Sequence, residues 1–224
     1  MKKFIYLIAA VAIVFIASCN ETKTADVAKT EDPKNAPTTD STAASYKVDT
    51  AASIVTWVGK KVTGKHNGTF QLSEGSLEVK NANIVAGGFT ININSMKSLD
   101  GSPEDNGKLT GHLLSPDFFD AAKYPTAKFV VTSVAAYTAP TDTTKKTMLQ
   151  GATHNITGNL TLKEQTKSVT FPAIVTINGD MVSANTLFVF DRTNWGLSYG
   201  ADKSLKDKMI YPEVELGINL LSKK

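Results

Sequence analysis

Hydrophobic and polar residues alternate with a period of two along most of the chain after residue 45. The clearest run is PEVELGINLL, in which every second residue from Val214 to Leu220 is aliphatic. Side chains two residues apart share one face of a strand, so this pattern predicts strands with one buried face. The predicted strands cover residues 53–62, 76–80, 87–94, 127–134, 155–163, 168–178, 182–190 and 212–221.

Turn signals separate several of these strands. Asn67-Gly68 and Asn178-Gly179 stand between strand runs, and both dipeptides tolerate the positive φ of a tight hairpin turn. The strands recur at close spacing, and no long helical segment alternates with them. The pattern therefore favours an antiparallel barrel or sandwich over a parallel α/β sheet.

One short helix is expected between Ser115 and Pro125. Serine is a good helix cap and Pro116 suits the first helical position. Phe118 and Phe119 would lie about 100° apart on this helix, so only one of them would face the sheet or a cavity. A shorter turn is expected around residues 108–114.

The first 19 residues have the pattern of a lipoprotein signal. Lys2 and Lys3 precede 14 uninterrupted apolar residues, which is typical of a secretory signal peptide and too short to span a membrane. The sequence from Ile16 to Cys19 resembles a bacterial lipobox, in which the cysteine carries the lipid. A buried free thiol is the alternative for Cys19, the only cysteine. The expected localisation is the bacterial cell envelope, as a periplasmic or outer-membrane lipoprotein.

Residues 20–45 contain no Ile, Leu, Met or aromatic residue. Such a segment buries too little apolar surface to offset the entropy of ordering it. The expected organisation is a signal peptide at 1–18, a lipidated disordered tether at 19–45 and a folded domain at 46–224.

The charges are mixed along the chain, with 24 basic and 21 acidic residues and a net charge of +3. Nucleic-acid binding needs a concentrated basic face, so the sequence argues against a nucleic-acid partner. There is also no phosphate-binding loop or dinucleotide fingerprint, and no cofactor is expected.

The sequence contains two candidates for chemistry: a serine nucleophile at Ser198 and a metal site at the histidines. The sequence GLSYG places Ser198 in a G-x-S-x-G motif, but in hydrolases with this motif the histidine base follows the serine, and here all three histidines precede it. The expected role of Gly196 and Gly200 is to form turns. His66 and His112 are too far apart for a local metal pair, and a metal site that the fold assembles from them stays open.

The order of motifs resembles the YceI-like family of bacterial lipid-binding proteins. The matching stretches are YKVDTAASIVTWVGKKVTGKHNGTFQLSEGSLEV with its histidine-glycine turn at 66–68, HLLSPDFFDAAKYPTAKF, ITGNLTLKEQTKSVTFP and FDRTNWGLSYG. Together they span nearly all of the chain from Tyr46 to Leu221. The resemblance implies an all-β, lipocalin-like antiparallel barrel of about eight strands with one or two short helices. It also implies a long isoprenoid or similar amphiphile, such as a prenyl lipid or quinone, as the ligand.

The resemblance implies a set of ligand-binding residues. A tail of about 40 heavy atoms at roughly 0.3 kcal/mol each would contribute about 12 kcal/mol. His112 and Arg192 are expected to bind the head group, while Arg192 pairing with Asp191 or Asp117 is the alternative. The residues expected around the tail, for which core packing is the alternative, are Trp57, Phe70, Phe89, Phe118, Phe119, Phe129, Phe188 and Trp195.

The main alternative to lipid binding is a structural or stress-response envelope lipoprotein whose barrel is filled by side chains. An enzyme is the other class of function, and it is not expected. The sequence does not indicate the oligomeric state.

Overall fold

The computed structural model describes residues 26–38, 40–139 and 147–224. The expected signal peptide and Cys19 lie outside the described residues. Within the described ranges, no helix is both long enough and apolar enough to cross a membrane.

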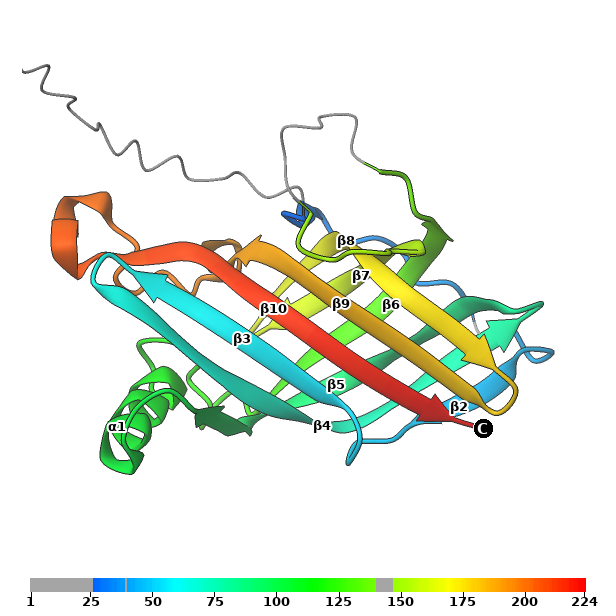
Figure 1. The fold of residues 1–224 in the computed structure, drawn as a ribbon, viewed down its shortest axis with the longest axis horizontal. Coiled ribbons are helices and arrows are strands. Elements are labelled where there is room, and N and C mark those ends of the chain that lie inside the picture. Colours follow the sequence, from blue (N-terminus) through cyan, green and yellow to red (C-terminus); the bar gives the residue numbers. More distant parts are fainter. Residues whose placement is uncertain (1–25, 39, 140–146) are drawn as a thin grey trace, which may run out of the picture.

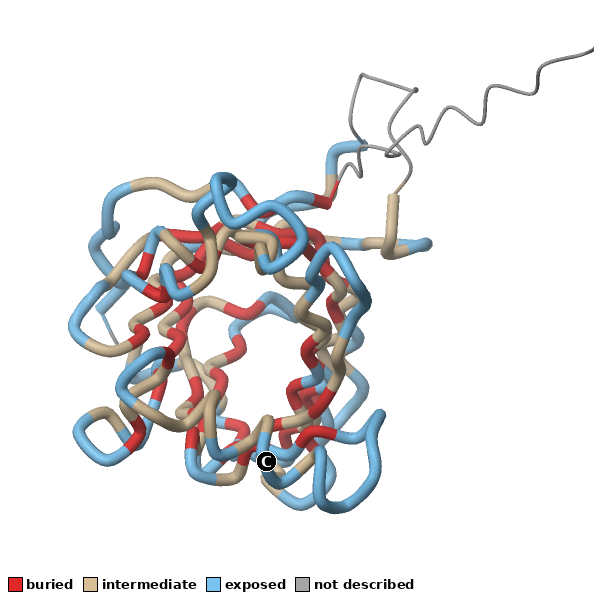
Figure 2. The backbone as a smooth tube through the Cα atoms, turned by 90° about the vertical axis from the view of Figure 1, so that its left-hand side faces the viewer, coloured by how far each residue is buried: buried red, intermediate tan, exposed pale blue. Residues whose placement is uncertain are grey.

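Eight antiparallel strands close into a barrel, which Figure 2 shows end-on as a ring. Neighbours in the ring pair in the order β3-β4-β5-β6-β7-β8-β9-β10, and β10 pairs with β3 to close it. This confirms the predicted all-β antiparallel barrel. The strands are β3 (Ile54–Lys61), β4 (Gly64–Lys80), β5 (Asn83–Ser98), β6 (Thr126–Ala136), β7 (His154–Leu162), β8 (Gln165–Asn178), β9 (Met181–Asp191) and β10 (Ile210–Lys223).

Two further strands complete the wall. β2 (Ala44–Val48) lies beyond the start of β3 and pairs with β4 on one side and β10 on the other. β1 (Lys29–Glu31) pairs with residues 168–170 of β8. The residues just before β1 reach β9, because Ala28 N donates to Val189 O over 2.7 Å and Val189 N donates to Asp26 O over 2.9 Å. β8 and β9 pair with each other only from Ile174 onward, so the N-terminal segment bridges the seam between them.

The expectation of a disordered tether is therefore wrong for residues 26–31. Ala28 is part of the core, and Asp26 is only 3% exposed. The Asp26 carboxylate accepts hydrogen bonds from the backbone N–H groups of Met148 and Leu149. These contacts are made by a small residue, a polar residue and the backbone. A search for large apolar residues does not detect them.

The helix lies earlier in the chain than expected. α1 (Pro103–Leu114) begins at Ser102, whose Oγ accepts a hydrogen bond from Asp105 N over 3.1 Å. Ser115 ends this helix instead of starting one, since both its N–H and its hydroxyl donate to His112 O. A serine followed by proline occurs at both places, and residues 116–123 form turns.

The two Asn-Gly dipeptides have different roles. Gly179 has a φ of 55° in the turn between β8 and β9, as expected. Asn67 and Gly68 instead lie inside β4 and pair with Val58 and Trp57, which corrects the predicted turn. A Cβ on Gly68 would lie 1.9 Å from the Lys97 carbonyl oxygen. Glycine is required there for close approach of two strands, not for a turn.

α1 lies at one end of the barrel, at the lower left of Figure 1, and the β3–β4 turn lies at the same end. Two short 3-10 helices, η1 (Arg192–Trp195) and η2 (Lys203–Lys208), follow β9 and lead back to β10. The chain end after β10 lies at the opposite end of the barrel (Figure 1).

Candidate functional site

A cavity of about 270 Å³ lies inside the barrel at the end where α1 lies. We call it the mouth cavity. Most of its wall is apolar, and the exposed side chains of Lys60 and Lys61 border it where it meets solvent. The lining residues are Trp57, Gly59, Lys60, Lys61, His66, Phe70, Met96, Leu109, His112, Leu113, Phe118, Phe119, Phe190, Arg192, Leu197, Ile210, Tyr211, Val214 and Leu216.

The strand alternation described above produces this wall. Val214 and Leu216 are two apart on β10 and both line the mouth cavity. Trp57 from β3 and Phe70 from β4 complete this side of the lumen. Trp57 and Leu216 are partners across the β3–β10 ladder, so their side chains lie next to each other on the inward face.

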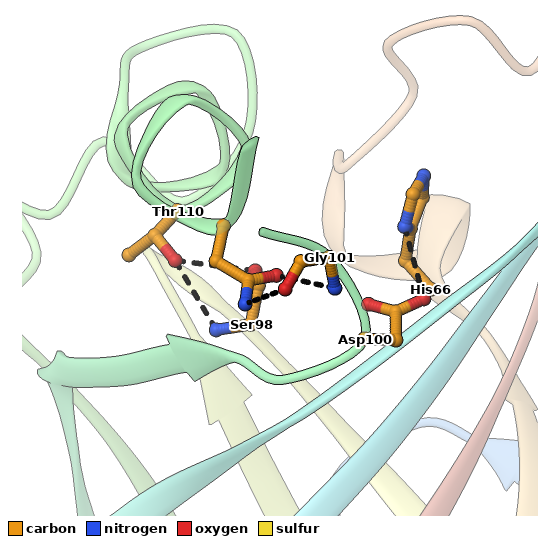
Figure 3. A network of polar contacts seen from close by, with 6 residues as sticks. His66, Ser98, Asp100, Gly101 and Thr110 are labelled. Atoms are coloured by element: carbon orange, nitrogen blue, oxygen red, sulfur yellow. Dashed lines mark hydrogen bonds and ion pairs between the residues drawn. The ribbon is translucent and has the colours of Figure 1, made fainter. Parts of the chain in front are cut away.

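Polar contacts hold α1 to the end of β5 and to the loop between them, as Figure 3 shows. Thr110 Oγ1 accepts from Ser98 N over 3.2 Å and contacts Ser98 Oγ at 3.1 Å. Asn106 bonds both the N–H and the carbonyl of Gly101, over 3.0 and 2.9 Å. The helix is thus held to the end of β5, and its side chains at 109, 112 and 113 line the cavity.

Two histidines line the mouth cavity, and each contacts a carboxylate. His66 Nδ1 lies 3.2 Å from Asp100 Oδ2, which Figure 3 also shows, and His112 Nε2 lies 3.2 Å from Asp117 Oδ2. His112, which the sequence analysis expected to bind a head group, lines this cavity, and its role as a ligand stays a prediction. Among the described residues, no group of three or more His, Cys, Asp or Glu could hold a metal ion, so the open question of a site at these histidines gains no support.

Arg192 lines the cavity, but its hydrogen-bond donors are directed mostly elsewhere. It donates to the backbone carbonyls of Leu197, Tyr199, Ile210 and Tyr211. Burial lowers the pKa of Arg192, and the nearby carboxylates of Asp191 and Glu213 act in the opposite direction.

The geometry corrects the ion-pair alternative for Arg192. Within the described chain it forms no ion pair with Asp191 or Asp117, and four of its five N–H groups are bonded to carbonyl oxygens. These bonds fix the loop after β9 to the start of β10, and contact with a head group stays a prediction.

Phe118 and Phe119 both line the mouth cavity. This contradicts the expectation that only one would face inward, which assumed a helix. Phe118 packs edge-on against His112, with ring centroids 5.2 Å apart, and Phe119 packs edge-on against Phe70 at 5.7 Å. The turns after Ser115 allow consecutive side chains to reach the same space.

The indole of Trp57 is buried, at 8% exposure, and its Nε1–H finds no acceptor among the described residues. A buried donor without a partner costs about 1–3 kcal/mol. Trp57 is therefore a wall residue that also offers an unused hydrogen bond, a feature that the sequence could not reveal.

The remaining predicted tail residues lie elsewhere. Phe89 and Phe129 line a second, smaller cavity of about 30 Å³, which we call the far cavity. Phe188 is buried and stacks on Phe171. Trp195 is fully buried, donates from Nε1 to Leu160 O over 2.9 Å and does not line the mouth cavity. For these four residues, the alternative of core packing describes the structure better.

Part of the wall was not predicted from the sequence. The predicted tail residues are all aromatic, whereas aliphatic side chains and Met96 contribute much of the lining. The alternation on β10 was a sufficient signal for Val214 and Leu216. Nothing local in the sequence indicated Leu109 and Leu113, since their helix was not predicted.

The glycines around Ser198 have the expected turn geometry. Gly196 has a φ of 75° and Gly200 a φ of 66°, both in the left-handed region. The loop interpretation of GLSYG is confirmed.

Residues 46–221 match the YceI-like domain. A UPF0312 protein of Pseudomonas putida is 33% identical over 141 residues, which are 62% of this chain and 64% of that protein. Protein YceI of Escherichia coli O157:H7 is 36% identical over 113 residues, half of each chain. The match therefore spans less than two thirds of each relative.

Solved structures share the fold. BcnA of Burkholderia cenocepacia superposes with a TM-score of 0.59 at 25% identity, covering 78% of this chain and 98% of that one. A domain from Saccharophagus degradans, described as polyisoprenoid binding, has a TM-score of 0.52 at 15% identity and covers 80% of this chain and 97% of that one. The chain belongs to the YceI-like family.

Proposed function

We propose that this protein binds a chain-like lipid, with the apolar tail in the mouth cavity and the polar head at the α1 end. The observation that carries the proposal is the cavity itself. Most of its wall is apolar, including Val214 and Leu216 of β10, and His66, His112 and the lysines give it a polar end near solvent. An amphiphile has the same division between tail and head. The polyisoprenoid binding described for the Saccharophagus domain supports an isoprenoid tail.

The polar end offers several contacts for a head group. His112, Lys60 and Lys61 border the cavity where it opens. A carbonyl, ester or ether oxygen of a ligand that lies against Trp57 would accept the unused Nε1–H and remove the cost of leaving it unpaired. A quinone or an oxygen-bearing prenyl lipid carries such an acceptor, whereas a pure hydrocarbon does not.

The proposed role is that of a binding protein, not an enzyme. Ser198 lies in a glycine turn, and the histidines at the mouth contact carboxylates of the rim. These groups can contact a head group without any chemical step.

Mass spectrometry of protein purified without detergent tests this function. We expect an added mass in the native spectrum and a lipid in the organic extract. A matched pair of variants at Gly59 and Gly64 locates the lipid. A Cβ at either position would meet no atom within 4 Å, so both positions have room for a side chain. Of the two, only Gly59 lines the mouth cavity. Gly59→Phe should lose the lipid and Gly64→Phe should keep it.

Two results would contradict the proposal. An organic extract that contains no lipid, made from protein purified from the natural host, would favour the packed-barrel alternative. Equal lipid content in the two glycine variants would place the lipid outside the mouth cavity.

A membrane anchor at Cys19 is a separate part of the proposal. It is supported by the lipobox-like sequence and places the barrel at the bacterial cell envelope. Cys19→Ala should accumulate as uncleaved precursor or appear in the soluble fraction. A cleaved variant that still partitions wholly into detergent-extracted membranes would rule this anchor out.

A further inference from the structure

The two cavities follow one another along the inside of the barrel. On β10, Val214 and Leu216 line the mouth cavity, and the next inward residues, Ile218 and Leu220, line the far cavity. Inward residues of a strand recur every second position, so this order is an order in depth. The lumen is therefore one tube interrupted at a single level.

β9 identifies the residues at that level. Phe190 lines the mouth cavity and Thr186 lines the far cavity. Phe188 lies between them on the same face, only 2% exposed, and pairs across the sheet with Leu216. It stands where the two cavities are separated.

Four phenylalanines extend this barrier across the lumen. The Phe188 and Phe171 rings are parallel within 1°, with centroids 4.3 Å apart. Phe171 is 5.6 Å from Phe129, and Phe129 is 5.4 Å from Phe89. The four residues come from β9, β8, β6 and β5, and all are buried. We call them the phenylalanine layer.

The backbone is shaped to hold this layer. A Cβ on Gly158 of β7 would lie 2.2 Å from Phe129 Cζ, so the ring occupies space that only glycine leaves open. Packed aromatic side chains resist displacement, because interiors are close to crystalline density.

We propose that the phenylalanine layer, which borders the far cavity at Phe89, Phe129 and Phe171, closes the lumen beyond the mouth cavity and sets the length of the apolar chain that this protein accepts. This inference rests on the proposed lipid binding. A cavity of about 150 Å³ holds benzene, with six heavy atoms, so the 270 Å³ mouth cavity holds roughly ten to twelve. The tail of about 40 heavy atoms expected from the sequence needs several times this room. The chain's ligand class is accordingly a short-tailed amphiphile, with about two isoprene units or a similar alkyl length inside the barrel.

A series of straight-chain alcohols with 8 to 18 carbons tests this limit on chain length. Their affinities are measured by isothermal titration calorimetry. We expect affinity to rise about fourfold per added methylene until the chain reaches the layer, and to stay level beyond roughly 12 carbons. Phe171→Ala removes one ring from the layer. The break, which is the chain length at which the affinity stops rising, should therefore move about five carbons longer.

Two further variants make the test specific. Phe171→Leu keeps more of the core volume and should move the break by about two carbons, which covers the case that the alanine variant does not fold. Ile156→Ala enlarges the far cavity without opening the layer and should leave the break unchanged. Circular dichroism and melting curves confirm that each variant is folded.

The outcomes separate the inference from the proposed function. Binding with no break up to 18 carbons, or a break that the folded Phe171 variants do not move, would overturn the limit set by the layer and leave lipid binding intact. An equal shift in Ile156→Ala would also overturn it. Failure of every alcohol to bind would overturn the proposed function itself.

Discussion

The indole of Trp57 lies directly over the backbone of Gly68, its partner across the β3–β4 ladder. A Cβ at residue 68 would come within 2.5 Å of the indole Cζ2 and 1.9 Å of the Lys97 carbonyl oxygen. The largest side chain of the mouth cavity is thus positioned by the absence of a side chain on its neighbour.

Gly68→Ala should therefore displace Trp57 and destabilise the barrel by about 3 kcal/mol, because neither the strand backbone nor the ring can move freely. Denaturant unfolding and the emission spectrum of Trp57 measure the two effects. Gly64→Ala, in the same strand with open space at its Cβ, is the matched control. Similar losses for both variants would show that the close approach at Gly68 is not a constraint.

Arg192 is the only arginine of the chain and joins four carbonyls of two segments. Arg192→Lys should cost about 2–4 kcal/mol of unfolding free energy, since lysine cannot replace the planar set of donors and leaves buried carbonyls unpaired. Lipid affinity should fall only through this loss of stability. A stable lysine variant with strongly reduced binding would instead support Arg192 as a head-group residue.

The N-terminal segment should stabilise the barrel. A chain that begins at residue 36 lacks β1, the buried Ala28 and the Asp26 contacts that a chain beginning at residue 26 retains. We expect its melting temperature to be about 5–10 °C lower, which corresponds to a few kcal/mol for a domain of this size. Calorimetry of the two chains makes the comparison. A difference below about 2 °C would mean that the segment behaves as the disordered tether that its composition suggested.

β1 should also respond to acid. Hydrogen bonds from Lys29, the larger effect, and from Lys34 lower the pKa of Glu31 from 4.5 to about 2. A carboxylate whose pKa is lowered by folding stabilises the fold above the unfolded pKa, so this contribution is present above about pH 4.5 and is lost as the pH falls towards 2. The group is on the surface, and the effect is small.

An NMR titration of the Glu31 carboxyl checks the acid response. Replacing Lys29 and Lys34 by Gln should return its midpoint towards the ordinary value. The same midpoint in both proteins would show that these lysines do not pair with Glu31 in solution.

The sequence predicted the barrel well because the alternation of apolar and polar residues along a strand indicates which face of the strand is buried. Val214 to Leu220 illustrate this, since the same four positions line the two cavities. It missed β1 because that strand is held by backbone hydrogen bonds and a buried alanine, neither of which makes a pattern. It misplaced the helix because Ser-Pro occurs at both 102–103 and 115–116, and the local residues do not distinguish a start from an end.

The candidate site was predicted in part. The motif around Arg192 identifies the arginine, but it does not reveal which backbone carbonyls its N–H groups bind. Aromatic residues were correctly expected inside, yet only depth along the tube separates Phe70 at the mouth cavity from Phe129 in the phenylalanine layer. That depth depends on strand register, which one sequence does not reveal.

The two tryptophans allow the most direct test of lipid binding in the mouth cavity. Trp57 lines this cavity, and Trp195 lies outside it, bonded to Leu160 O. An alkyl alcohol brominated on its chain is titrated into Trp195→Phe and Trp57→Phe, each at a concentration that calorimetry shows to be saturating. The bound chain should quench the Trp57 emission more strongly than the emission of Trp195, which lies behind Phe190 of the cavity wall. Equal quenching of both tryptophans, or none of Trp57 at saturation, would contradict a lipid site in the mouth cavity.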